Sequence, residues 1–350
     1  MSRKMIKIVG MILTVTMLCS LGGCQSKEVS QTENKAIKIG VAIYRGDDAF
    51  ISSLCSYLEG QIKEQEEKIG RKIIVNMVDA KNSQSSQNDQ VDNFINKGYD
   101  VICVNMVDRT AAAVIVDKAK EAEIPIIFFN REPVEEDMRI WSQEYYVGSD
   151  AQEAGTMEGQ MVADAYKESP QSFDKNGDGK IQYVMLEGEQ VHQDALIRTE
   201  YSVKTMTKEG LVMEKLASGT GNWMRSPAYE KMLSWVQQFG TQIELVISNN
   251  DEMALGAIEA LREKNMLENG PKVVGIDGTK DGLEEIVKGE MMGTVKNDAK
   301  EQARSILEIA CACAEKKDPS EVASYLRGHY VRVPHYVVTS ENAAEVLKQY

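Results

Sequence analysis

The chain has 350 residues, with 40 Lys and Arg against 54 Asp and Glu, and a formal net charge of −14 at pH 7. This acidic balance argues against a nucleic-acid-binding protein and against a membrane surface recognised by charge, because both partners are themselves anionic. A chain of this length is longer than one hydrophobic core usually holds, so we expect two lobes.

The N-terminus has the features of an export signal. Three basic residues precede the apolar run IVGMILTVTMLCSL, which is too short to span a bilayer comfortably. The run leads into LGGC, which looks like a lipobox, so residues 1–23 are predicted to be a lipoprotein signal peptide and Cys24 the lipid-modified first residue. An ordinary signal peptide or a membrane anchor helix is the alternative. Residues 24–36 are polar and aperiodic, as in a tether. We therefore expect an exported protein, in the periplasm or at the outer face of the cell membrane, held only by lipid on Cys24.

From residue 36 onward, strand-like runs alternate with segments of helical spacing. The strand-like runs begin with IKIGVAIY and end with MGTVKND, and the helical segments include 84–97, 110–122, 150–167 and 251–265. This alternation predicts an α/β protein with two Rossmann-like lobes, whose parallel sheets are flanked by helices.

Polar side chains follow several of the predicted strands at the point where each strand ends. In parallel sheets, ligands bind beyond the carboxyl ends of the strands. For any single strand, the alternative is that Asn or Asp caps the next helix. Repetition at several strand ends favours a ring of amides, carboxylates and Arg around one cleft, which suits a polyhydroxylated ligand. The residues in question are Arg45, Asp47, Asp48, Asn105, Asp108, His192, Asp194, Arg198, Asn249, Asn250, Asp251, Asp277, Asn297 and Asp298.

Two aromatic residues complete the pattern expected of a sugar site, because the C–H faces of a pyranose need flat apolar surface. Phe50 follows the acidic loop after the first strand, and Trp223 lies in the Gly- and Ser-containing loop SGTGNWMRSP. The alternatives are a helix residue packing inward for Phe50 and a lid over the edge of a core for Trp223.

The segment DKNGDGKIQ, residues 174–182, is similar to a calcium loop. Oxygen donors stand at loop positions 1, 3 and 5, which are Asp174, Asn176 and Asp178, and Gly follows at position 6. Position 12 of an EF-hand would be Met185, and a strand-like run follows where a helix should. From these residues alone, either the similarity is accidental or the missing carboxylate comes from elsewhere.

Much of the chain after residue 36 resembles the periplasmic galactose/glucose-binding proteins, which are substrate-binding components of sugar ABC transporters. The matching stretches occur in the family's order and include IGVAIYRGDDAF, DVICVNMVD, IPIIFFNREP, HQDALIRT, ELVISNNDEMALGAIEAL and VVGIDG. The resemblance implies the type I periplasmic-binding-protein fold with a three-segment hinge. We expect an N-terminal lobe of residues 37–124 and 297–331, and a C-terminal lobe of 125–296 and 332–350.

The resemblance also implies roles for individual residues. Phe50 and Trp223 match the aromatic pair that sandwiches the sugar, and Asp48 matches the carboxylate that receives the 4-hydroxyl, whose orientation separates glucose from galactose. Gln193 replaces the family's usual Pro, and Gly46 and Ala49 replace larger residues, so the sugar preference stays open. The other implied sugar partners are Asn105, His192, Asp194, Arg198, Asn250, Asp277 and Asn297.

The resemblance implies a structural calcium ion in the loop at 174–182. Its implied ligands are Asp174, Asn176, Asp178, the backbone carbonyl of Lys180, Gln182 and, as the bidentate carboxylate from a distant strand, Glu244.

We therefore expect a monomeric binding protein, and not an enzyme, that delivers galactose or glucose to an ABC permease. A glycoside hydrolase would also use paired carboxylates in a sugar cleft. A sugar-responsive repressor would need an N-terminal DNA-binding element where this chain has an export signal. A sensor that docks on a chemoreceptor or a histidine-kinase ectodomain, and a pentose-binding transport component, are the remaining alternatives.

Overall fold

The computed structural model describes residues 35–350. The predicted signal peptide, Cys24 and the predicted tether up to residue 34 lie outside the described residues. Within the described part of the chain, no helix is both long and apolar enough to cross a membrane.

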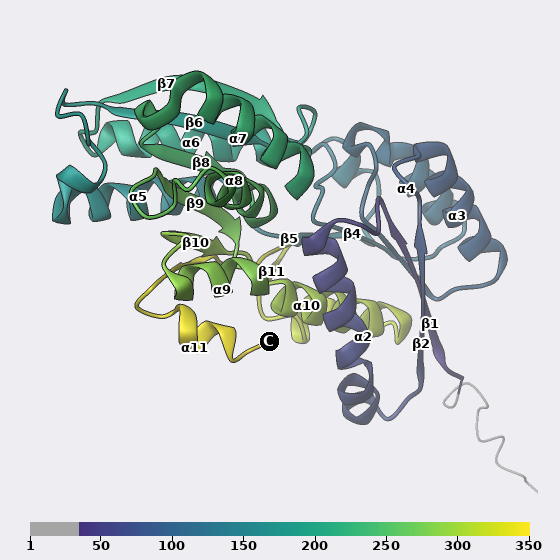
Figure 1. Ribbon diagram of the computed structural model, residues 1–350. Coiled ribbons are helices and arrows are strands. Elements are labelled where there is room, and N and C mark those ends of the chain that lie inside the picture. The colour runs from purple at the N-terminus through teal and green to yellow at the C-terminus, as the bar shows by residue number, and fades with distance from the viewer. Residues whose placement is uncertain (1–34) are drawn as a thin grey trace, which may run out of the picture. The chain divides into compact units, whose positions relative to one another are not determined.

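The first lobe is built on a seven-stranded sheet with the order β11-β12-β5-β4-β3-β1-β2, in which only the β11–β12 pair is antiparallel. Helices α2 (Ala49–Ile69) and α10 (Ala299–Ala314) cover one face, and α3 (Gln84–Asn96) and α4 (Ala112–Glu121) cover the other (Figure 1). The strands are β1 (Ile37–Ile43), β2 (Ile73–Asp79), β3 (Val101–Val104), β4 (Ile126–Phe129), β5 (Glu144–Gly148), β11 (Leu326–Arg327) and β12 (Tyr330–Arg332).

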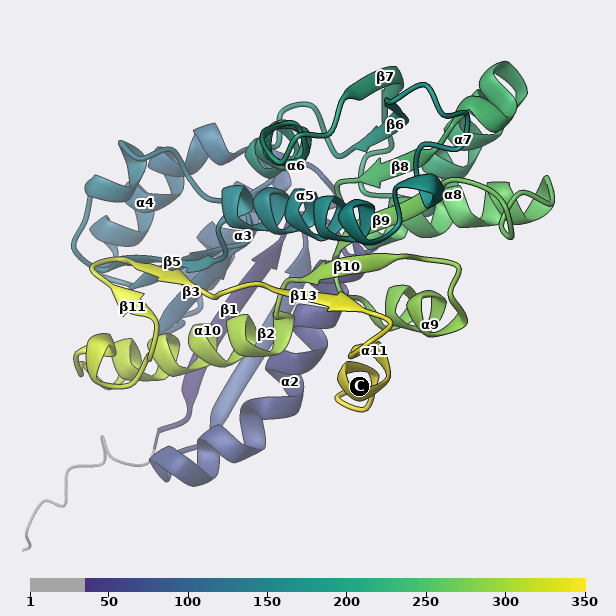
Figure 2. The same cartoon turned by 90° about the vertical axis from the view of Figure 1, so that its left-hand side faces the viewer.

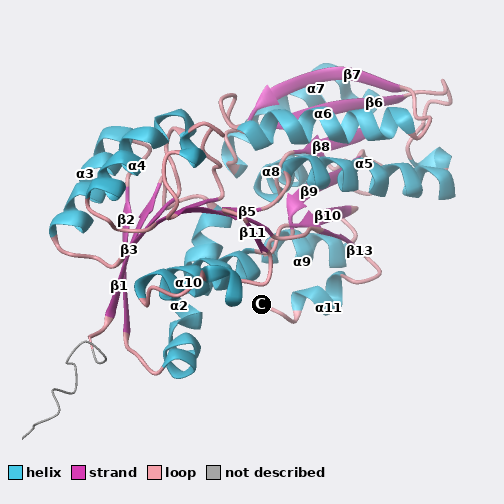
Figure 3. Ribbon diagram, turned by 180° about the vertical axis from the view of Figure 1, so that it is seen from behind, coloured by secondary structure: helices cyan, strands magenta, loops and turns pink. Residues whose placement is uncertain are grey.

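The second lobe is built on a six-stranded sheet with the order β13-β10-β9-β8-β6-β7, in which β13 is the antiparallel edge strand. Helices α5 (Ala151–Glu168) and α6 (Gln193–Lys208) lie on one face, and α7 (Arg225–Phe239) and α8 (Asp251–Glu263) on the other (Figure 3). The remaining elements are β6 (Ile181–Glu187), β7 (Met213–Thr220), β8 (Leu245–Ser248), β9 (Lys272–Asp277), β10 (Gly293–Lys296), β13 (Tyr336–Thr339), α9 (Lys280–Lys288) and α11 (Ala343–Leu347). The predicted α/β architecture of two lobes with mainly parallel sheets is confirmed.

The chain passes between the two sheets after β5, after β10 and after β12. Figure 2 shows the last of these passages, where the C-terminal segment leaves the first sheet and continues into β13 beside β10. The predicted lobe boundary at residues 124–125 is wrong, because β4 pairs in parallel with β3 and β5 pairs with β4. The apolar run of β4 is buried on both faces, and such a run fits the middle of either sheet equally well.

Helix α5 packs closely against α6, the helix that carries Arg198. A Cβ atom added to Gly155 would lie 2.9 Å from the carbonyl oxygen of Arg198, and one added to Gly159 would lie 2.5 Å from that of Ser202. The two glycines are four residues apart, so they share one face of α5. Their lack of side chains lets the α6 backbone approach closely and sets the position of Arg198.

Glu158, between these glycines, is fully buried, and burial raises its pKa to about 8. The unfolded chain should titrate this carboxyl near the ordinary Glu value of about 4.3. The folded state therefore binds the proton more tightly, and this group adds stability as the pH falls from 8 to 5. We predict that Glu158→Gln reduces the gain in unfolding free energy between these pH values by about 3 kcal/mol.

Urea denaturation of the wild type and the variant at pH 5 and pH 8 measures this difference. Glu168→Gln, which changes an exposed carboxylate at the end of the same helix, is the matched control and should leave the pH dependence unchanged. Equal pH dependence in the wild type and Glu158→Gln would contradict the assignment.

Candidate functional site

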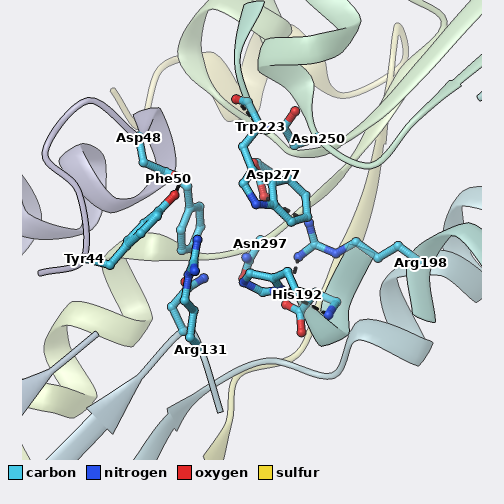
Figure 4. A pocket seen from close by; sticks show the side chains of 12 residues that line it. Tyr44, Asp48, Phe50, Arg131, His192, Arg198, Trp223, Asn250, Asp277 and Asn297 are labelled. Carbon is cyan, nitrogen blue, oxygen red and sulfur yellow. Dashed lines mark hydrogen bonds and ion pairs between the residues drawn. The ribbon is translucent and has the colours of Figure 1, made fainter. Parts of the chain in front are cut away.

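A cavity lies where the carboxyl ends of strands from both sheets meet (Figure 4). Nine of the ten residues predicted to bind a sugar line it, and only Asn105 among them does not. The lining residues are Tyr44, Asp48, Phe50, Asn130, Arg131, His192, Asp194, Arg198, Trp223, Asn250, Asp277 and Asn297. Residues from sequence positions 44 to 297 are thus brought together as the strand-end rule predicts. Their role in binding a sugar stays a prediction.

Asn105 is placed one layer behind the cavity wall. Its side chain is completely buried, and Nδ2 donates hydrogen bonds to the carbonyl oxygen of Phe129 and to Oδ1 of Asn130. The amide is therefore engaged with the end of β4. Oδ1 of Asn105 is buried and has no hydrogen-bond partner within residues 35–350, so the direct contact of Asn105 with a sugar stays a prediction.

Three lining residues were missed by the sequence analysis, namely Tyr44, Asn130 and Arg131. The Tyr44 hydroxyl donates a 2.6 Å hydrogen bond to Oδ2 of Asp48, and the Arg131 guanidinium lies 3.6 Å from the centre of the Tyr44 ring. The polar pair Asn130–Arg131 follows β4 in the sequence FFNREP. The strand-end signal used for the other strands would have found both residues, whereas Tyr44 reads as the last residue of an apolar strand.

Several cavity residues also cap the helices that follow them. Oδ1 of Asp48 accepts from the backbone N–H of Ile51 at the start of α2, and Oδ1 of Asn250 accepts from Met253 in α8. The alternative that these residues cap helices is therefore correct, and the same residues also line the cavity. One oxygen of Asp48 serves the helix, and the other receives the Tyr44 hydroxyl and keeps further acceptor capacity.

His192 is held as a neutral hydrogen-bond donor. Its Nδ1 accepts from the backbone N–H of Asp194, so the proton of the neutral ring is assigned to Nε2. Burial lowers the pKa of His192 well below its usual value, and the charges of Arg131 and Arg198 lower it further. The imidazole is therefore uncharged at neutral pH.

Arg198 is the central cation of the site. It is only 4% exposed, and its guanidinium lies 3.7 Å from Oδ2 of Asp194 and 3.8 Å from Oδ1 of Asp277. Burial raises the pKa of both carboxyls, and the charge of Arg198 opposes this effect. At these distances neither carboxylate makes a close hydrogen bond to Arg198, so both keep lone pairs for ligand hydroxyls.

Phe50 and Trp223 reach into the cavity from opposite sides (Figure 4), Phe50 from α2 of the first lobe and Trp223 from the loop before α7 of the second. The backbone of Trp223 has φ 65°, and that of Asp277 has φ 123°. Such conformations are unfavourable for residues other than Gly and gather at functional sites. A Cβ atom on Gly188 would lie 2.2 Å from the Trp223 ring, so Gly188 provides the space that the indole occupies.

Charge pairs join the two lobes beside the cavity. Glu189, which follows β6 in the second lobe, places Oε2 2.9 Å from Nη2 of Arg131 and Oε1 3.7 Å from Nη1 of Arg45, both in the first lobe. We call these three residues the inter-lobe triad. The cavity measures about 30 Å³, which holds one or two water molecules but not a pyranose. The cavity must therefore widen before it can hold a ligand of that size.

Hydrogen bonds connect several of the predicted calcium ligands in and around the loop at 174–182. Oε1 of Glu244 accepts from the backbone N–H of Lys175 and Oε2 from that of Gln182, while Gln182 Nε2 donates to Oδ2 of Asp178. Asn176 Nδ2 donates to Oε1 of Gln182. Glu244 therefore meets the loop, although they are far apart in the sequence.

The carboxylates alone do not make a metal site. In residues 35–350, no three His, Cys, Asp or Glu side chains are grouped as a metal ion would need. Calcium would thus depend as well on amide oxygens from Asn176 and Gln182 and on the carbonyl of Lys180, and such neutral oxygens are ordinary calcium ligands.

Comparisons with known proteins agree with this geometry. The family model "Periplasmic binding protein domain" matches residues 39–318. The D-galactose/methyl-galactoside binding periplasmic protein of Haemophilus influenzae is 36% identical over 346 residues, which cover 98% of this chain and 100% of that protein. A putative rhizopine-binding protein of Rhizobium meliloti is 30% identical and covers 92% of this chain and 96% of its own length. A solved ABC transporter solute binding protein from Bacillus halodurans, with bound myo-inositol, is 30% identical with a TM-score of 0.75, covering 91% of this chain and 99% of that one.

We predict that Gly188→Ala displaces Trp223, because the new methyl group would occupy space now filled by the indole. Overpacking of this kind costs about 1–3 kcal/mol of stability unless the ring moves out. With Trp141 and Trp235 replaced by Phe, the fluorescence of Trp223 should shift to longer wavelength as the ring reaches water. Gly60→Ala, which adds a methyl group in open space, is the control. An unchanged spectrum together with unchanged stability would contradict this prediction.

Proposed function

Since the chain belongs to the periplasmic binding protein domain family, and is therefore a binding protein and not an enzyme, we propose that it binds D-galactose or D-glucose in the cavity between its lobes and delivers the sugar to an ABC transporter permease. One observation carries the proposal. Two aromatic rings face a ring of carboxylates, amides and one central arginine, and the members come from both lobes. This combination matches the alternating C–H faces and hydroxyl edge of a pyranose.

The names of similar proteins support this class of ligand. The relative from Haemophilus influenzae is described as binding D-galactose and methyl-galactoside, and the structure from Bacillus halodurans holds myo-inositol. All are rings with several hydroxyl groups. In our proposal, Asp48 accepts the 4-hydroxyl, and Phe50 and Trp223 cover the two faces of the sugar.

The proposed ligand also links the lobes. Asp48 and Phe50 belong to the first lobe, while Trp223, Arg198 and Asp277 belong to the second. A sugar held by both sets favours the closed form over the open one, because only the closed form offers all the contacts. The closed form would be the one that the permease recognises. Lipid on Cys24 would keep the exported protein near its partner, although that residue lies outside the described part of the chain.

We further propose that the loop at 174–182 holds a structural calcium ion. Asp174, Asn176, Asp178, the Lys180 carbonyl and Gln182 would bind it together with Glu244. The ion would join the loop to the segment before β8 and so stabilise the second lobe.

Calorimetric titration of residues 25–350 with D-glucose, D-galactose, D-ribose and L-arabinose tests the sugar proposal. We expect glucose or galactose to bind with micromolar or tighter affinity. Asp48→Asn should weaken that affinity by about ten-fold or more, as expected for a lost hydrogen bond to a charged group, while its Oδ1 still caps α2. Trp223→Ala should weaken it at least as much.

Asp47→Asn changes a neighbouring carboxylate outside the cavity lining and is the matched control. Binding of a pentose alone would keep the transport role but would show that Asp48 has another partner. Absence of heat with all four sugars would contradict the proposal.

Calcium is expected to raise the melting temperature. Saturation at about 100 times the dissociation constant adds about 2.7 kcal/mol, which corresponds to a rise of several degrees for a lobe of this size. Scanning calorimetry with calcium or with a chelator measures the shift, and Glu244→Gln should remove most of it. Asp164→Asn, an acid outside the loop, should retain it. An equal melting temperature in calcium and in chelator would exclude the site.

A further inference from the structure

A buried polar pair stands at the start of α10, at positions where apolar side chains often pack together. Asp298 is the N-cap of this helix, because its Oδ1 accepts from the backbone N–H of Glu301. Asn297 precedes the cap and Gln302 lies in the first turn beyond it, which is the spacing of a hydrophobic staple. Here Nε2 of Gln302 donates a 2.6 Å hydrogen bond to Oδ1 of Asn297 instead. Gln302 is 1% exposed and Asn297 is 3% exposed, so this amide pair is buried.

Stability of the fold does not by itself account for a glutamine at position 302. Its Oε1 is buried and has no hydrogen-bond partner within residues 35–350. A buried polar atom without a partner costs free energy, and an apolar side chain of similar shape would avoid this cost. The one hydrogen bond that the Gln302 side chain makes in the described part of the chain is the bond to Asn297. The glutamine is therefore best explained by what it does to Asn297.

The carboxyl group of Asp277 fixes which way the Asn297 amide points. Burial raises the pKa of Asp277 well above its ordinary value, while the charge of Arg198 and a side-chain hydrogen bond with Asn297 oppose this rise. A carboxylate beside Arg198 accepts hydrogen bonds and does not donate them, so Nδ2 of Asn297 is the atom that faces Asp277. Oδ1 of Asn297 then faces the opposite way and needs a donor, which Gln302 supplies.

This orientation decides what Asn297 can offer a ligand. Asn297 and Asp277 both line the cavity (Figure 4), and Gln302 does not. Because the oxygen of Asn297 points to Gln302, the group left for a ligand is the N–H of Nδ2. The carboxylates of Asp48, Asp194 and Asp277 offer acceptors. A ligand oxygen beside Asn297 must therefore accept a hydrogen bond, and the hydroxyl protons of the ligand must point to the carboxylates.

We propose that Gln302 is a positioning residue that fixes Asn297 as a hydrogen-bond donor to the bound sugar. The inference deepens the proposed function and rests on it, since it needs a sugar in the cavity. Gln302 belongs to α10 of the first lobe, Asp277 ends β9 of the second, and Asn297 lies on the passage between the sheets. Gln302 thus determines the donor pattern of the site without touching the sugar.

Calorimetric titration of the wild type and of Gln302→Met tests this role, because Met keeps the length of the side chain and removes its donor. We expect the hexose that the wild type prefers, galactose or glucose, to bind the variant about five-fold more weakly. The melting temperature should stay within a few degrees of the wild-type value, since the unpaired Oε1 is removed together with the bond. Gln65→Met, at a buried glutamine of α2 outside the cavity lining, is the matched control and should leave the affinity unchanged.

Pairs of sugar analogues measure the direction of the hydrogen bond. Fluorine in place of a hydroxyl group can accept a hydrogen bond but cannot donate one, and the deoxy sugar can do neither. At the hydroxyl position beside Asn297, the wild type should bind the deoxyfluoro sugar about three-fold more tightly than the deoxy sugar. In Gln302→Met this preference should be lost at that position and kept wherever Arg198 is the donor. A weaker affinity with every such preference unchanged would show a merely structural role and overturn the proposal.

Nuclear magnetic resonance of the sugar-free protein tests the orientation independently. The side-chain N–H signals of Asn297 can be assigned by their loss in Asn297→Asp. Their hydrogen exchange should be faster in Gln302→Met, because the amide is no longer held from its oxygen side, and unchanged in Gln65→Met. Equal exchange in the wild type and Gln302→Met would overturn the positioning role, whether or not a sugar binds. If the wild type binds no sugar but exchange becomes faster in Gln302→Met, the proposed function fails and the hold of Gln302 on Asn297 is supported.

Discussion

The site depends above all on how the buried charge of Arg198 is compensated. An isolated cation with so little exposure would be very costly, and removing one partner of a buried ion pair is strongly destabilising. Here Asp194 and Asp277 flank the guanidinium, and its Nη1 also donates to the carbonyl oxygen of Asn249. The glycines of α5 let the backbone that carries Arg198 approach closely. Packing and electrostatics therefore fix the same side chain, and the remaining cavity residues are arranged around it.

Some residues of this protein both cap a helix and line the cavity. A parallel strand followed by a helix places the N-cap residue at the carboxyl edge of the sheet, which is also where ligands bind. Asp48 and Asn250 each use one polar atom for the helix that follows. This fixes their rotamers before any ligand arrives, so little side-chain entropy remains to be lost on binding.

Much of the fold and most of the cavity lining could be predicted from the sequence, because strand–helix alternation and strand-end polar residues are local signals. The lobe to which β4 belongs could not be predicted, because the sequence of a strand buried on both faces does not indicate which strands pair with it. Asn105 shows the limit of the strand-end rule. The rule places the residue at the correct edge, but it does not predict that Asn105 Nδ2 donates to the Phe129 carbonyl or that Asn105 lies outside the residues that line the cavity. The place of Tyr44 in the cavity lining could not be predicted, because its ring continues the apolar pattern of the strand. Its hydroxyl donates a hydrogen bond to Asp48, which the sequence pattern does not indicate.

The inter-lobe triad sets how strongly closure depends on the ligand. When the lobes part, Arg131 and Glu189 regain water, so the net contribution of their pairing to closure is small compared with its Coulomb energy. The triad thus determines which closed arrangement forms more than whether closure occurs. The ligand must supply the rest, through contacts that neither lobe can complete alone. Asp48 and Phe50 line the cavity from the first lobe, and Trp223 and Arg198 line it from the second. In our proposal, selection of the sugar and closure of the lobes are therefore a single event, and a change in either set of contacts alters both.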